Sequence, residues 1–112
     1  MKKINHSISQ VDLPLNLQVL NISVNVARLS QWVFEGYEKR TELIDKFMVQ
    51  TENYLNDLNS QNISEEFKPT LNRFKKEFDD LKIKLMDQEN KLYWAEKALT
   101  WANILQHRAK LA

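Results

Sequence analysis

The chain has 112 residues, which suits one small domain, with 43% hydrophobic and 28% charged residues. It contains one glycine, two prolines and no cysteine, which excludes a disulfide framework, a thiolate metal site and a glycine-rich phosphate loop. The formal net charge of +1 is too small for electrostatic binding of nucleic acid to be the default expectation.

We expect no targeting signal in the first residues. Met1-Lys2-Lys3 is followed by the mixed run Ile4-Asn5-His6-Ser7 rather than by an apolar core of the kind that signal peptides have. No run approaches the roughly 18 consecutive apolar residues of a membrane span. We therefore expect a cytoplasmic protein that makes no contact with a membrane.

Residues 1–11 are polar and show no hydrophobic period, so we expect a flexible N-terminal tail before one helical domain over residues 12–112. Asp12-Leu13-Pro14 predicts a helix start, because an N-cap residue is followed by a proline suited to the first turn.

Residues 15–34 fit two patterns. Leu15, Leu17 and Val19 alternate with polar residues, as in a strand, while Leu17, Leu20 and Val24 also lie at helical spacing. No turn signal divides the run, and a lone hairpin would have no further strands to pair with. We therefore predict a largely buried helix.

Gly36 leaves two alternatives open, a helix end at this position or a continuous helix that tolerates one glycine. From Tyr37 the helical period is clear, and nothing around Gly36 resembles a loop. We therefore predict one bent helical arm over residues 14–59.

Asn59-Ser60-Gln61-Asn62 is the clear connector, since these residues are polar and common in turns. A connector at 59–63 leads to a second arm over residues 64–110, with Ser64 as a candidate N-cap. Pro69 lies deep for a first turn, so either the helix begins near Lys68 or residues 64–67 form a separate turn.

The second arm carries an apolar seam at alternating steps of four and three, and only two glutamines interrupt it. Its members are Phe67, Leu71, Phe74, Phe78, Leu81, Leu85, Gln88, Leu92, Ala95, Leu99, Ala102, Gln106 and Ala109. A seam this long predicts a coiled-coil-like helix with a partner of similar length. The fold expected is all-α: a long antiparallel helical hairpin, with arms of about 65–70 Å.

A second stripe runs beside this seam and contains Trp94 and Trp101. One arm cannot cover both stripes, so we predict a homodimer in which two hairpins form a four-helix bundle, with Trp101→Glu weakening the association. The expected interface residues are Trp94, Ala98, Trp101, Leu105, Leu20, Val24 and Leu29.

A stripe of carboxylates supplies the alternative of a small all-α enzyme. Glu35, Glu38, Glu42, Asp45 and Glu52 share one helical face and could hold Mg²⁺ between subunits, with Arg28 or Arg40 nearby. Lysines at i+4 pair with two of these acids, which is typical of a solvated face. No metal or cofactor is therefore expected.

Two further candidates are weaker. The basic residues of the second arm, such as Arg73 and Lys76, alternate with acids, so a nucleic-acid-associated role is a lesser alternative. His107 resembles the lone histidine of a phosphotransfer bundle only formally, because no motif surrounds it. The function expected is a non-enzymatic assembly or adaptor protein, which acts through protein–protein interaction with its own copy or an unidentified partner.

Overall fold

A computed structural model describes residues 10–112, which are helical and contain no β-strand. The all-α prediction is confirmed, and so is the choice of helix for residues 15–34. The four long helices are α1 (Leu15–Glu35), α2 (Thr41–Asn59), α3 (Lys68–Ile83) and α4 (Lys91–Arg108). Short 3₁₀ turns follow at η1 (Tyr37–Lys39), η2 (Gln88–Asn90) and η3 (Ala109–Leu111).

The prediction of one continuous helix over residues 14–59 is wrong, because the chain reverses at Gly36. Gly36 has φ +133°, a backbone conformation that residues with a Cβ atom rarely adopt. Its N–H donates to the carbonyls of Trp32 and Val33, which closes the last turn of α1. The alternative of a helix end at this glycine therefore holds.

The predicted second arm is also interrupted, between α3 and α4. The indole Nε1 of Trp94 donates to the carbonyl of Leu81 at 2.8 Å. A helix end leaves such carbonyls without partners, so the buried indole satisfies one of them. In a straight helix these residues would stand about 20 Å apart, so the bond requires the reversal. The long antiparallel hairpin is therefore corrected to four shorter helices.

The connector between α2 and α3 spans residues 60–67, longer than the predicted 59–63. Residues 65–67 form a separate turn, and α3 begins at Lys68 with Pro69 in its first turn. This start suits proline, which lacks the N–H that a first turn leaves unpaired.

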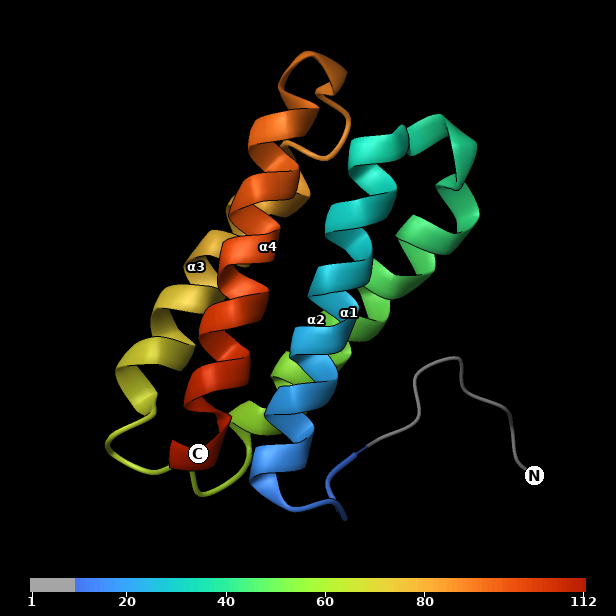
Figure 1. Cartoon of the computed structure of the whole chain (residues 1–112). Coiled ribbons are helices and arrows are strands. Elements are labelled where there is room, and N and C mark those ends of the chain that lie inside the picture. The colour runs from blue at the N-terminus through green and yellow to red at the C-terminus, as the bar shows by residue number, and fades with distance from the viewer. Residues whose placement is uncertain (1–9) are drawn as a thin grey trace, which may run out of the picture.

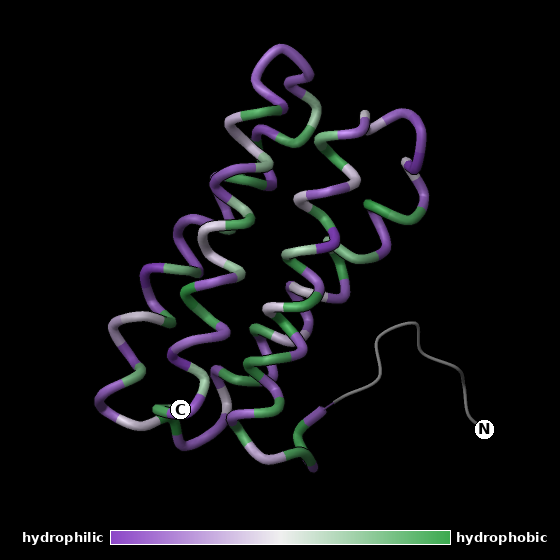
Figure 2. The backbone as a smooth tube through the Cα atoms, viewed as in Figure 1, coloured by the Kyte–Doolittle hydropathy of each residue, from purple (hydrophilic) through white to green (hydrophobic). Residues whose placement is uncertain are grey.

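The helices alternate in direction, and the first and last lie side by side. Figure 1 shows α1 (blue to cyan) antiparallel to α4 (orange to red), with α2 behind α1 and α3 behind α4. The connectors at residues 36–40 and 84–90 lie at the same end, and Figure 2 shows both as mostly hydrophilic. They meet there, since the N–H of Tyr37 donates to Oε1 of Gln88 at 3.3 Å.

The hydrophobic core draws on all four helices. Its fully enclosed large side chains include Ile22, Leu29, Ile44, Phe67 and Phe74. The ring of Phe74 lies 5.6 Å from the Trp101 ring and 5.8 Å from the Phe78 ring, so aromatic packing joins α3 to α4.

Residues 1–9 of the predicted tail lie outside the described residues, but the end of the tail is anchored. Gln10 is buried, and its amide hydrogen-bonds to the carbonyl of Gln18 and to the side chain of Asn21. Gln18 in turn exchanges amide hydrogen bonds with Gln61 of the connector. Buried amides require such partners, so this polar cluster secures the start of α1.

An ion cluster joins α3 to α4. Nζ of Lys97 lies 2.8 Å from Oδ2 of Asp80 and also contacts Glu77, while Lys84 approaches Asp80 at 3.3 Å. Burial alone would lower the pKa of Lys97, but its bonds to Asp80 and Glu77 raise it above its usual value. The hydrogen bonds from Lys97 and Lys84 lower the pKa of Asp80.

We expect Asp80→Asn to lower the free energy of unfolding at pH 7 but to leave it unchanged in strong acid. A carboxyl with a lowered folded pKa stabilises the protein above its usual pKa of about 3.9, and that contribution disappears as the pH falls through the folded value. Urea titrations of both chains at pH 7 and at about pH 2 measure the difference. An equal difference at both values would contradict a charge-dependent contribution.

Candidate interaction surface

Small residues at heptad spacing set the contact between α1 and α4. Oγ of Ser23 donates to the carbonyl of Ala102 at 2.7 Å, and Oγ of Ser30 donates to the carbonyl of Ala95 at 2.6 Å. A hydroxyl on so short a side chain reaches the next helix only where the backbones approach closely. Each of the four residues is buried. Ala98, fully buried, lies between the two bonded carbonyls on α4.

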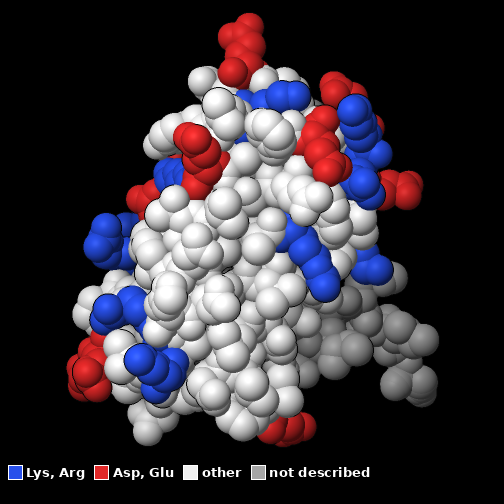
Figure 3. All heavy atoms as spheres, viewed as in Figure 1, with Lys and Arg blue, Asp and Glu red and all other residues white. Residues whose placement is uncertain are grey.

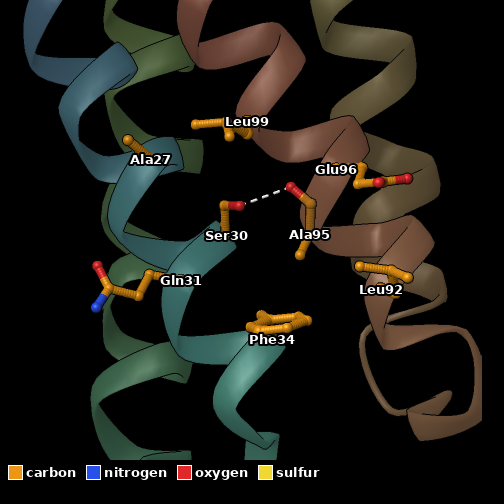
Figure 4. A pocket seen from close by; sticks show the side chains of 8 residues that line it. All are labelled: Ala27, Ser30, Gln31, Phe34, Leu92, Ala95, Glu96 and Leu99. Atoms are coloured by element: carbon orange, nitrogen blue, oxygen red, sulfur yellow. Dashed lines mark hydrogen bonds between the residues drawn. The ribbon is translucent and has the colours of Figure 1, made fainter.

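The residues beside this contact turn outward and form a shallow groove. Figure 4 shows Phe34 and Leu92 at one end of it and Ala27 and Leu99 at the other, with the Ser30–Ala95 bond between them. The groove has a volume of about 450 Å³. We define the α1/α4 face as Leu17, Leu20, Val24, Ala27, Gln31, Phe34, Leu92, Glu96, Leu99, Asn103 and Gln106.

Large apolar side chains on this face are about half exposed. The exposed fractions are 42% for Leu17, 46% for Val24, 52% for Phe34, 55% for Leu92 and 47% for Leu99. Single exposed leucines are ordinary on protein surfaces, but adjoining ones mark contact sites.

Charge is depleted on the exposed sides of α1 and α4. One of seven exposed residues of α1 is charged, and two of nine on α4, against three of six on α2 and four of seven on α3. Arg28 turns aside to lie over the Phe47 ring of α2, and Arg108 donates to Thr70 of α3. Glu96 therefore remains as the one charged residue of the face. Figure 3 shows this broad uncharged area, with most charged side chains around its margin.

The interface predicted from sequence lies mostly in the core of the single chain. Trp94, Ala98, Trp101, Leu105 and Leu29 are all buried within the described residues, so they need no second copy to cover them. Trp101→Glu is therefore expected to unfold the chain rather than to separate two folded copies. Val24 is exposed on the α1/α4 face and Leu20 is partly exposed there.

The residues that sequence reasoning missed are Phe34, Leu92 and Leu99. The last two belong to the predicted intrachain seam, yet they face outward. Residue size is the signal that separates the outward-facing seam positions Leu92 and Leu99 from the buried seam positions. Alanine at 95 and 102 repeats with a step of seven, as does serine at 23 and 30. Small residues at that spacing indicate the side on which two helices approach most closely.

The candidate magnesium ligands do not converge. Glu35 pairs with Arg40 at 3.3 Å, Asp45 accepts a hydrogen bond from the Tyr37 hydroxyl, and Glu52 pairs with Lys82 on α3. The hydrogen bond to Asp45 raises the pKa of Tyr37. Among residues 10–112, no group of three histidine, aspartate or glutamate side chains is placed to hold a metal ion.

The lesser candidates also lie apart. His107 is exposed in the last turn of α4, beside Arg108. Lys76 and Arg73 are exposed on α3, where the guanidinium of Arg73 lies over the Trp101 ring. Within the described part of the chain, no helix combines the length and the apolar character needed to cross a membrane.

Comparison of the chain with models of known protein families, with curated proteins and with solved structures gives no match.

Proposed function

We propose that this chain is a non-enzymatic helical protein that acts by binding another protein through the α1/α4 face. The observation that carries the proposal is the combination, on one face, of half-exposed large apolar side chains with a near absence of charge. Protein interfaces have this composition at their centres, where charged residues are depleted and aromatic residues are enriched.

The geometry of the face supports the same proposal. The serine–carbonyl bonds hold α1 and α4 in a fixed register, so the groove is formed before a partner arrives. A preformed surface loses less conformational entropy on binding than a flexible one. The polar residues Gln31, Glu96 and Asn103 lie on the same face and could supply hydrogen bonds for specificity.

In-cell photo-cross-linking tests this function. A photoreactive phenylalanine analogue at Phe34 on the face should form protein adducts in the native host. The same analogue at Val49, exposed by 58% on α2, is the matched control and should form none. Failure to form adducts from position 34, or the same adducts from both positions, would contradict the proposal. Mass spectrometry of the adduct identifies the partner.

A further inference from the structure

We propose that the α1/α4 face binds a second copy of this chain, about a two-fold axis that runs along the helices. This inference rests on the proposed function and names its partner. It differs from the dimer expected from sequence, because the contact uses Phe34, Leu92 and Leu99 rather than the buried tryptophans.

Charge is the first argument for a second copy. In a two-fold contact the same surface appears on both sides, so a face with several like charges would repel itself. The α1/α4 face carries only one charged residue, Glu96, and its other polar groups are the amides of Gln31, Asn103 and Gln106. An amide both donates and accepts hydrogen bonds, so it can pair with an identical group. A strongly acidic or basic partner would find almost no opposite charge here.

The register along the face is the second argument. The serine–carbonyl bonds place residue 23 level with 102 and residue 30 level with 95. A two-fold rotation about an axis parallel to the helices keeps every residue at the same height along that axis. It therefore places α1 of one copy against α4 of the other in the register that the two helices have within one chain. Phe34 then meets Leu92 of the second copy, and Ala27 meets its Leu99. Gln31 meets its Glu96, so apolar groups face apolar groups and an amide faces the carboxylate.

The area available is the third argument. The five half-exposed apolar side chains add up to roughly 400 Å² of apolar surface, within the range of patches that carry function. Ala27 and the amides between them extend the face toward the roughly 800 Å² per partner of a standard interface. Each residue enters a two-fold contact twice, so a modest face makes a sufficient interface.

Sedimentation equilibrium of the purified full chain tests the second copy. We expect a monomer–dimer equilibrium at micromolar concentrations, and we expect Leu99→Glu to raise the dissociation constant by about tenfold or more. Val49→Glu, which places the same carboxylate on an exposed apolar site of α2, should dimerise like the wild type. Equal thermal melts of both variants at low concentration show that they fold.

Charge variants at Gln31 test the axis. Gln31→Lys places an ammonium opposite Glu96 of the second copy and should lower the dissociation constant several-fold. Gln31→Glu places two carboxylates together and should raise it by a similar factor. Equal dissociation constants for the two variants would overturn the axis.

Two outcomes overturn the second copy itself: a wild-type chain that stays monomeric at about 100 μM, and a Leu99→Glu variant that dimerises unchanged. The proposed function fails separately. A monomeric chain whose residue 34 still forms adducts with a different protein would retain that function with another partner, and an absence of adducts would remove it.

Discussion

Phe74→Ala should lower the free energy of unfolding by about 3–5 kcal/mol, the range measured for deleting a buried aromatic ring. Phe74 is completely enclosed, and its ring packs against both Phe78 and Trp101, so the cavity would lie between α3 and α4. Native proteins have a total stability of about 5–15 kcal/mol, so the variant should lose a large part of its stability.

Phe34→Ala is the matched control, because it removes the same ring from a site that is 52% exposed. We expect it to cost less than about 1 kcal/mol in dilute solution, where the α1/α4 face has no partner. Urea denaturation of both variants gives the comparison. Equal losses in the free energy of unfolding would contradict a core that encloses Phe74 and leaves Phe34 half exposed.

Ala98→Leu should destabilise the fold by about 1–3 kcal/mol or more, although leucine is a good helix former. Ala98 has no exposed surface and lies between the two residues of α4 whose carbonyls accept the serine bonds. A larger side chain must push α1 and α4 apart, which lengthens both bonds. The buried serine hydroxyls would then lose their acceptors.

Thr100→Leu is the control for this substitution, since Thr100 is exposed on the same helix. We expect its thermal midpoint to stay close to that of the wild type. A wild-type midpoint for Ala98→Leu as well would contradict the close approach of α1 and α4.

Helix formation was predictable from sequence because the apolar period runs through nearly the whole chain and only one glycine interrupts it. The predicted antiparallel hairpin, with its connector near residue 60, also implies that its two ends lie side by side, and α1 and α4 do so. The reversal at 84–90 did not follow, because the heptad seam continues across it from Leu85 to Leu92. The polar run Asp87-Gln88-Glu89-Asn90 was the available signal, and Gln88 proved to be a connector residue rather than a seam position.

The exposed face was harder to predict, because α4 carries two apolar stripes. A long hairpin needs the stripe of Leu92 and Leu99 for its own contact and leaves Trp94 and Trp101 outside. The reversal between α3 and α4 buries Trp94 instead, because α3 folds back and its Leu81 carbonyl accepts a hydrogen bond from the Trp94 indole. Which side chains of the seam face outward thus depends on tertiary contacts that the heptad pattern does not contain.

The reactivity of introduced cysteines measures directly which side chains of α4 are accessible. The native chain has no cysteine, so each variant carries a single reactive thiol. A cysteine at Leu99, which is 47% exposed, should react rapidly with a thiol reagent in dilute solution, and one at the fully buried Ala98 should react only as fast as the protein unfolds. Raising the protein concentration should slow the reaction at position 99, where a partner would cover the face, and leave a cysteine at Val49 unaffected. Equally rapid reaction at positions 98 and 99, or no effect of concentration at 99, would contradict an α1/α4 face that is exposed in the monomer and covered on association.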